Sequence, residues 1–259
     1  MSELSAVLVI AHRDFIKLLR DRARLVSDFV FPLLLIGLLG PALQAGFGSP
    51  DGLDLTTFVF TGVLAQTVWQ SAAQGVISLI ADRDEDFSQE MFVSPISRYS
   101  IVVGKIIGES LVALPQAIAI IGFGLLLRVP MSIPTLVAVG VTIPIIAVFG
   151  ASFGILVLSN LTNQRQANQI FPFVMLPQFF LAGVFTPVEN LPPFLAILSR
   201  LTPMRYAVDL VRNAYYYFQP SDVPATAATA PENLTVIAAM FAIFIVVGTA
   251  RFVRSERNR

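Results

Sequence analysis

The chain has 259 residues, 55% of them hydrophobic and 13% charged, and its mean hydropathy is +0.75. Soluble domains carry about 25% charged residues, so this composition excludes a soluble globular protein and indicates an integral membrane protein. The 17 basic and 17 acidic residues cancel, and the absence of cysteine excludes disulfides and thiolate-bound metals.

Six stretches are long enough to cross a bilayer, which takes about 20 apolar residues in a helix. They span residues 25–43, 57–80, 101–127, 133–158, 169–185 and 234–252. The segments between them are too short to hold a soluble catalytic domain of ordinary size. We therefore expect a single all-α membrane domain over residues 1–259 with six transmembrane helices.

Basic residues indicate which side of the membrane each loop faces, because cytoplasmic loops are enriched in Lys and Arg. All but four of the 17 Lys and Arg residues lie near the two termini or near the connections after the second and fourth predicted spans. The four exceptions are Arg128, Arg200, Arg205 and Arg212. Both termini should therefore be cytoplasmic, and the charged start of the chain argues against a signal peptide.

Residues 1–24 have the pattern of a helix that lies flat in the membrane interface. Apolar and basic side chains recur there at helical spacing, with Leu4, Leu8, Phe15, Leu18 and Leu19 set against Arg13, Lys17, Arg20 and Arg24. An apolar face in lipid and a basic face toward anionic headgroups favour this interpretation. A solvated basic helix remains the alternative. Asp28 is expected to stay among the headgroups near Arg24.

The second predicted span carries a polar stripe. Its polar residues recur every three or four positions and so share one helical face: Thr67, Gln70, Ser71, Gln74 and Ser78. Such a face does not point into lipid. Two compatible interpretations remain open, because these side chains can join helices inside a bundle or can line a transport path.

Residues 81–99 are acidic and amphipathic, and they are expected on the cytoplasmic side. Phe87, Met91 and Phe92 form an apolar ridge beside acidic residues such as Glu90. Helices tend to end before a proline, which places an end near Pro95, with Arg98 beyond it. Exposed Phe and Met on a charged helix favour docking into a groove of a partner protein.

Lys105 and Glu109 stand four residues apart at the start of the third predicted span, so they can form an ion pair on one helical face. The pair lowers the cost of placing charge in the membrane interface. A structural pair is favoured over a proton relay, because no series of further carboxylates follows it across the membrane.

The stretch from 171 to 212 is apolar but contains six prolines, so it cannot form one uninterrupted helix. Irregular backbone at membrane depth requires protein or a water-filled cavity beside it. We expect Phe173, Gln178 and Phe180 of this broken helix to approach the polar stripe, and to face a second subunit together with it.

Residues 186–218 are predicted to lie on the outer side of the membrane. Arg205, Asp209 and Arg212 stand at i, i+4 and i+7, so one carboxylate can bridge two guanidinium groups. Tyr206 begins a group of aromatic residues that fits a belt at the water boundary.

The sequence contains no motif typical of an ATP-binding, catalytic or metal-binding site. Gly104-Lys105 is followed by Ile106, so a phosphate-binding loop is not formed there. We expect no catalytic constellation, no metal site and no nucleic-acid partner. An intramembrane enzyme is therefore disfavoured, and few ionisable groups within the spans disfavour an ion-coupled carrier or channel.

Two segments resemble the type-2 ATP-binding-cassette (ABC) export permeases. The first contains Asp82-Arg83-Asp84 and Val93-Ser94-Pro95-Ile96-Ser97-Arg98, and the second contains Phe171-Pro172, Leu176-Pro177, Ala182-Gly183-Val184-Phe185-Thr186-Pro187, Leu191-Pro192 and Pro203-Met204-Arg205-Tyr206. Asp86 stands where glycine is common in that family, so the sequence departs from the family pattern at this turn. The resemblance extends over essentially the whole chain.

Several expectations follow from this resemblance alone. It implies a coupling helix at 81–99, a second cytoplasmic contact near 160–169 and an outer re-entrant segment after the fifth span. It also implies a permease without its own ATPase site, paired with a second, identical permease and with two ATPase subunits that bind ATP and Mg. The complex would export an amphipathic or lipid-linked substrate across a bacterial cytoplasmic (inner) membrane.

Overall fold

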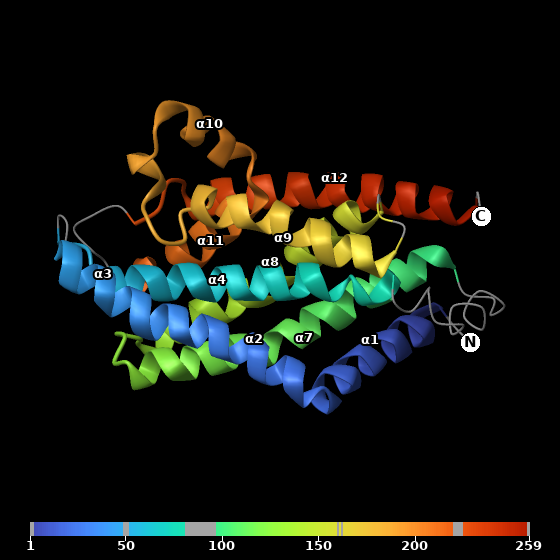
Figure 1. The fold of residues 1–259 in the computed structure, drawn as a ribbon, viewed down its shortest axis with the longest axis horizontal. Helices are drawn as coiled ribbons and strands as arrows, with labels where there is room; N and C mark the ends of the chain where they lie inside the picture. Colours follow the sequence, from blue (N-terminus) through green and yellow to red (C-terminus); the bar gives the residue numbers. More distant parts are fainter. Residues whose placement is uncertain are drawn as a thin grey trace.

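The computed structural model describes residues 3–48, 52–80, 97–159, 161, 163–219 and 225–257. Over these residues the chain is helical and contains no strand, so the all-α prediction is confirmed. The long helices run side by side along the long axis of an elongated bundle (Figure 1).

The first part of the chain forms two helical rods. Helix α1 (Glu3–Arg20) is separated from the second rod by Asp21, and that rod consists of α2 (Arg22–Leu34), the π-helical turn η1 (Leu35–Leu39) and α3 (Gly40–Phe47). Pro32 lies inside α2 and removes one backbone donor. The wider π-turn three residues later lets the rod continue without a break.

The remaining helices follow in chain order. They are α4 (Leu55–Gly75), α7 (Arg98–Leu126), α8 (Ile133–Leu158), α9 (Gln164–Leu181), the 3₁₀ turn η3 (Val188–Asn190), α10 (Pro193–Leu201), α11 (Pro203–Phe218) and α12 (Ala230–Arg257). Their starts are encoded locally. For example, Ser97 caps α7 by accepting a hydrogen bond from the Ser100 amide at 3.1 Å, which satisfies a free N–H of the first turn.

Four of the predicted spans coincide with helices that are long and apolar enough to cross a membrane. Within the described residues these are Asp28–Gly46, Tyr99–Leu126, Ile133–Leu158 and Ala230–Phe252. The chain is thus a multi-pass membrane protein.

The other two predicted spans, 57–80 and 169–185, are helical in α4 and α9 but are not among those four. Both helices carry glutamines that lower their hydropathy, so their crossing stays a prediction. Helix α9 also passes through Pro172 and Pro177 without ending. The chain leaves helical structure only at Ala182, later than the density of prolines suggests.

Helix α4 is the core of the bundle, with 17 of its 21 residues buried. Trp69 lies at its middle against Phe153 and Phe149 of α8, with ring centroids 4.9 and 6.4 Å apart, and Phe244 of α12 stacks on Phe149 at 5.7 Å. Offset and edge-to-face aromatic contacts of this kind add to the gain from burial. The cluster therefore fastens α8 and α12 to α4.

Helices α4 and α8 approach each other at two glycines, four residues apart. A Cβ atom on Gly150 would lie 2.2 Å from the Trp69 carbonyl oxygen, and one on Gly154 would lie 2.3 Å from that of Ala73. Small residues at this spacing permit close contact between membrane helices. Gly140 of the same helix differs from these two, because nothing lies within 4 Å of a Cβ atom there.

Helix α1 lies against α7 and is more than an interfacial helix. Ala6, Ile10 and Asp14 are buried in this contact, whereas Leu4, Leu8 and Leu19 remain exposed. Leu18, predicted for the lipid face, is only 1% exposed. Helix α1 thus packs one face against the protein and leaves part of its apolar surface exposed.

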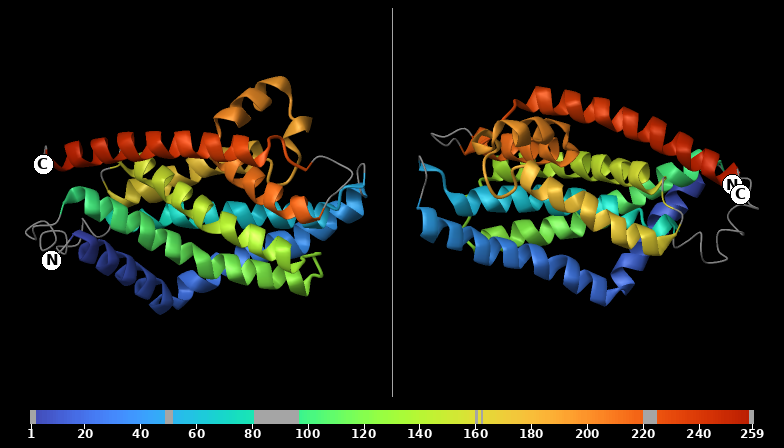
Figure 2. Two further views of the ribbon diagram at one scale, coloured as in Figure 1. Left: turned by 180° about the vertical axis from the view of Figure 1, so that it is seen from behind. Right: turned by 45° about the horizontal axis from the view of Figure 1, so that its top comes forward.

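The bundle has two distinct ends. The start of α1 and the end of α12 lie together at one end, and α10 and α11 lie at the other, where α10 projects from the bundle (Figures 1 and 2). This arrangement agrees with an even number of crossings between the termini.

Candidate functional site

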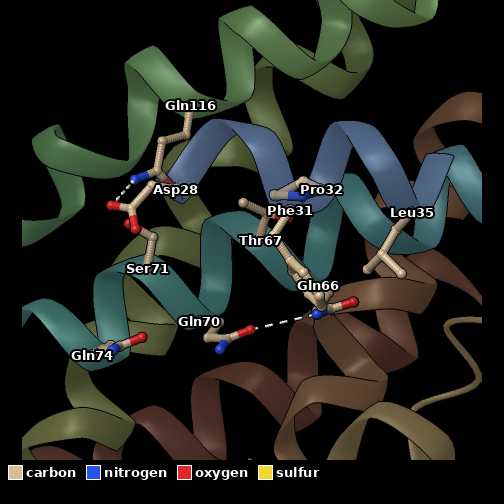
Figure 3. A pocket seen from close by; sticks show the side chains of 10 residues that line it. All are labelled: Asp28, Phe31, Pro32, Leu35, Gln66, Thr67, Gln70, Ser71, Gln74 and Gln116. Atoms are coloured by element: carbon tan, nitrogen blue, oxygen red, sulfur yellow. Dashed lines mark hydrogen bonds between the residues drawn. The ribbon is translucent and has the colours of Figure 1, made fainter. Parts of the chain in front are cut away.

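The polar stripe of α4 lies beside a cavity of about 180 Å³ between α2, α4 and α7. Thr67, Gln70, Ser71 and Gln74 line it from α4, and Asp28 and Gln116 line it from the facing helices (Figure 3). Gln66 donates to Gln70 along α4 at 3.4 Å, and Gln116 donates to the Asp28 carboxylate at 3.1 Å. The prediction that four of the stripe residues share a face is confirmed by this arrangement.

Gln70 and Gln74 also line a second cavity, of about 300 Å³, on the side of α9. Its other walls are apolar: Phe171, Pro172, Phe173, Met175, Leu176 and Phe179. Gln74 is exposed although it belongs to the most buried helix, and the Phe173 side chain beside it is 80% exposed. A polar row between two cavities is an arrangement that can contact an amphipathic molecule.

Two of the residues expected here lie elsewhere. Gln178 is buried and donates to the Val174 carbonyl of its own helix at 3.1 Å. Phe180 is 62% exposed and its ring lies 6.5 Å from that of Phe185. Neither residue lines either of the two cavities described beside the stripe. Phe173 is therefore the residue of this group that the structure places next to Gln70 and Gln74.

Ser78, the last residue of the stripe, belongs to a buried ionic network. Lys105 of α7 contacts Glu109 at 2.9 Å, as the sequence predicted, and also contacts Asp14 of α1 at 2.8 Å. Ser78 donates to Glu109 at 3.0 Å. The Lys105, Glu109 and Asp14 side chains are 1–3% exposed, and Arg13 adds a second cation 3.2 Å from Asp14. Two buried carboxylates thus share Lys105, and the partly exposed Arg13 adds a cation at the edge of the network.

Gly75 is required by this network, because a Cβ atom there would lie 1.8 Å from Glu109 Oε2. The network joins α1, α4 and α7 a few residues before position 81, where the predicted coupling segment begins. Sequence reasoning missed Asp14. Its only signal was the spacing of Ala6, Ile10 and Asp14, which places an acid on the apolar face of α1.

The residues predicted to contact an ATPase lie mostly outside the described residues. Phe87, Glu90, Met91, Phe92 and Pro95 fall in the interval 81–96, and Arg98 begins α7. Just after that interval, the Glu3 carboxylate accepts hydrogen bonds from the Ser97 amide and the Ser100 hydroxyl. The Ser100 hydrogen bond lowers the pKa of Glu3. The starts of α1 and α7 are therefore tied together beside the predicted coupling segment.

Arg212 of the outer segment fastens α11 to two other parts of the chain. Its guanidinium donates to the Phe58 and Val184 carbonyl oxygens, both at 3.3 Å, and lies 3.6 Å from the centre of the Phe58 ring. Burial lowers the pKa of Arg212 to about 10, so the group stays charged at neutral pH. It joins α11 to the start of α4 and to the turn after α9.

Asp209 does not bridge the two arginines as the sequence predicted. None of the ion pairs among the described residues joins Asp209 to Arg205 or Arg212. Instead Asp209 accepts from the Ala227 amide at 3.3 Å, and Arg205 donates to Ser199 at 3.2 Å. The i, i+4 spacing permits contact but does not require it, and each arginine has a closer partner here.

Ser199 and Tyr206 complete the attachment of α10. The Ser199 hydroxyl donates to the Leu181 carbonyl at the end of α9 at 2.6 Å. The Tyr206 hydroxyl donates to the Arg200 carbonyl at 2.7 Å. These bonds use backbone carbonyls that the helix ends leave free, and they hold the segment after α9 in a defined shape.

Among the described residues, no three His, Asp or Glu side chains gather in a way that could hold a metal ion.

Sequence reasoning did not find the contact between Asp28 and Gln116. Asp28 was expected to remain near Arg24, whose side chain lies outside the described residues, and the Asp28 carboxylate lies in the wall of the cavity (Figure 3). An acid at the start of a span and an amide in the middle of another give no sign of their proximity.

Known proteins resemble this chain over most of its length. The family model described as ABC-2 type transporter matches residues 5–216. The "Putative transport permease ycf38" of Cyanophora paradoxa is 26% identical over 216 residues, which cover 82% of this chain and 74% of that relative. The "Inner membrane transport permease YadH" of Escherichia coli (strain K12) is 25% identical over 201 residues, or 77% of each chain.

A third relative matches a shorter part. The "Probable multidrug ABC transporter permease YbhR" of Escherichia coli (strain K12) is 29% identical over 141 residues, which cover 54% of this chain and 38% of that relative.

Replacing Lys105 with Met should strongly destabilise the protein, because Asp14 and Glu109 would remain buried without their shared cation. Breaking a buried ion pair by removing one partner costs about 3–5 kcal/mol. The measurement is the melting temperature of the purified protein in detergent. The triple variant Asp14→Asn, Lys105→Met, Glu109→Gln should recover much of the loss, and Lys17→Met, which removes an exposed cation from α1, should have little effect. A single variant as stable as wild type would contradict this role.

Asp209 should make stability depend on pH. Burial raises its pKa from 3.8 to about 6, against the opposing effects of Arg212 and Arg205. A raised pKa means that the folded state favours the neutral acid, so stability is highest below the unfolded pKa and falls as pH rises through about 6. The change is on the order of 3 kcal/mol.

The measurement is the melting temperature of wild type and Asp209→Asn between pH 4 and pH 7.5. Wild type should lose stability over this range, and the variant should lose less. Parallel curves for the two proteins would show that Asp209 does not titrate in this window.

Proposed function

Because the chain belongs to the ABC-2 type transporter family, we propose that it is the membrane-spanning permease subunit of an ABC exporter. Its role is membrane transport, and members of the family associate with an ABC ATPase. In this proposal a separate ATPase hydrolyses ATP with Mg, and the permease moves an amphipathic or lipid-linked substrate outward.

The observation that carries the proposal is the exposed end of the polar row on α4. Gln74 is exposed between two cavities, on a helix that is otherwise buried. Beside it α9 exposes Phe173 and Leu176. A polar row next to exposed apolar side chains offers contacts to both parts of an amphipathic molecule, and a lone protomer leaves these contacts open.

The finer architecture is part of the same proposal. Helices α4 and α9 complete a set of six spans in the inner membrane, and both termini face the cytoplasm. Residues 186–218 form a re-entrant segment on the outer side, held by Arg205, Tyr206 and Arg212. Two identical permeases meet along α4 and α9, and two ATPases dock on residues 81–99.

Transport in inverted membrane vesicles tests the function. The vesicles contain the permease with or without a co-expressed ATPase, and the substrates are fluorescent amphiphiles of positive, zero and negative charge. Uptake should need both ATP and the ATPase. Phe92→Asp in the permease should abolish it, because a charge would be buried without a partner in the docking groove. Uptake that instead follows a proton or sodium gradient, with no need for ATP, would favour an ion-coupled carrier.

Disulfide crosslinking tests the shared path, and the natural chain contains no cysteine to interfere. Gln74→Cys should crosslink two permeases under mild oxidation, because the exposed side chain would face its counterpart across the dimer axis. Leu125→Cys on α7 is the matched control, since Leu125 is 49% exposed but lies away from α4 and α9 in the proposed dimer. Equal crosslinking at the two positions would contradict the proposed interface.

A further inference from the structure

The cavity between α2, α4 and α7 is lined by buried acceptor atoms that receive no hydrogen bond from the protein. Gln66 on α4 and Gln116 on α7 are 2% and 1% exposed, and neither Oε1 atom has a hydrogen-bond partner. The Ser71 hydroxyl in the same wall is also buried and without a partner. The large majority of buried side-chain polar atoms are hydrogen-bonded. Three such atoms around one cavity therefore indicate a ligand that can bond to them.

The amide nitrogens of the two glutamines already have acceptors. Gln66 donates to the Gln70 side chain at 3.4 Å, and Gln116 donates to the Asp28 carboxylate at 3.1 Å (Figure 3). These two bonds set the orientation of each amide group. The carbonyl oxygens are therefore the ends of Gln66 and Gln116 that are left for a ligand, and such a ligand must donate hydrogen bonds to them.

An uncharged hydroxyl group fits this wall better than a charged group does. A hydroxyl both donates and accepts, so it can donate to the amide oxygens and also accept from the Ser71 hydroxyl. An anion only accepts, which would leave Gln66 Oε1 and Gln116 Oε1 unpaired beside the Asp28 carboxylate. A cation within a membrane domain requires a counter-ion, and the Asp28 carboxylate is already engaged with the Gln116 amide.

The cavity continues onto an apolar surface. Phe31, Pro32 and Leu35 line it from α2 and η1, and Phe31 is 57% exposed (Figure 3). Farther along the same rod, Leu34 and Leu38 are 51% and 66% exposed. Ordered water can satisfy the polar wall of a cavity, but it gains nothing from the apolar surface beside it. The two adjoining surfaces together suit a molecule with a hydroxyl head and an alkyl chain.

We propose that this cavity binds the uncharged, hydroxyl-bearing head of an amphiphile, with Gln66, Gln116 and Ser71 as its hydrogen-bond partners. The alkyl chain of the amphiphile lies along α2 and η1. The inference rests on the proposed function and names a substrate class for it. The exposed Gln74 follows Ser71 by one helical turn along the stripe, so the bound head lies next to the face that two permeases are proposed to share.

Binding of tritiated dodecylglycerol to the full chain tests the site. The protein is placed in nanodiscs of dioleoylphosphatidylcholine, a lipid whose head group has no hydrogen-bond donor, and specific binding is defined by displacement with unlabelled dodecylglycerol. Wild type should bind saturably. Gln66→Met and Gln116→Met keep the size of the side chain, and each should weaken the affinity about threefold to tenfold through the loss of one hydrogen bond. A cavity that holds water alone would give no saturable binding, which would overturn the proposal.

Ser71→Ala separates binding from folding. The Ser71 hydroxyl bonds to no group of the protein, so its removal should leave the melting temperature without dodecylglycerol unchanged and should still weaken the affinity. Ser110→Ala on α7 is the matched control, because the buried Ser110 hydroxyl donates to the Ile106 carbonyl of its own helix at 2.7 Å, away from the cavity lining. This control should bind dodecylglycerol as wild type does. Wild-type affinity in all three cavity variants would contradict the assigned hydrogen bonds.

Two analogues with the same alkyl chain test the chemistry of the head. The dimethyl ether of dodecylglycerol keeps the oxygen atoms but has no hydrogen to donate, so it should compete poorly. Dodecylammonium carries a charge and should also compete poorly. Displacement by either analogue at the same concentrations as dodecylglycerol would rule out an uncharged hydroxyl head.

The hydroxyl head can come from two sources, a membrane lipid or a soluble amphipathic alcohol, and diacylglycerol added to the nanodiscs distinguishes them. Competition with dodecylglycerol assigns the site to a lipid, and unchanged binding assigns it to a soluble alcohol. Both results support the shared chemistry. Because binding is measured without ATP or an ATPase, loss of the site and loss of ATP-driven export are seen separately, and either can fail while the other holds.

Discussion

Polar groups at membrane depth must find partners inside the protein, and this requirement organises the bundle around α4. The helix carries Thr67, Gln70, Ser71 and Gln74 on one side, yet most of its surface is buried by neighbouring helices. On the opposite side Gly150 and Gly154 allow α8 to approach its backbone directly. Helix α4 therefore packs closely against α8 on one side and lines a polar cavity on the other.

The two ends of α4 are held in place by different sets of charged side chains. At one end Arg212 lies on the Phe58 ring and bonds its carbonyl. At the other, Ser78 just beyond α4 bonds Glu109, which shares Lys105 with Asp14. Each contact brings in a distant part of the chain, the outer segment in one case and α1 in the other. A movement at either end would therefore be transmitted along one rigid, well-packed helix.

This arrangement connects the two places where the proposed exporter would act. The predicted ATPase-docking segment follows the Ser78 end, and the outer segment is attached at the Phe58 end. Between them lies the polar row with its two cavities. In the proposed exporter, the helix that lines the path would thus also connect the ATPase side with the outer side.

The sequence by itself determined the membrane class, the all-α fold, four of the spans, the Lys105–Glu109 pair and the common face of the polar stripe. These follow from local composition and helical period, which neighbouring residues fix. Tertiary structure alone decided that Asp14 joins Lys105, 91 positions away, and that Gln116 meets Asp28, 88 positions away. It also decided that Arg212 contacts carbonyls on α4 in preference to Asp209. Helical spacing predicts which side chains can meet on one helix. The partner of a buried charge depends instead on which other helix lies opposite it, and no local sequence pattern contains that information.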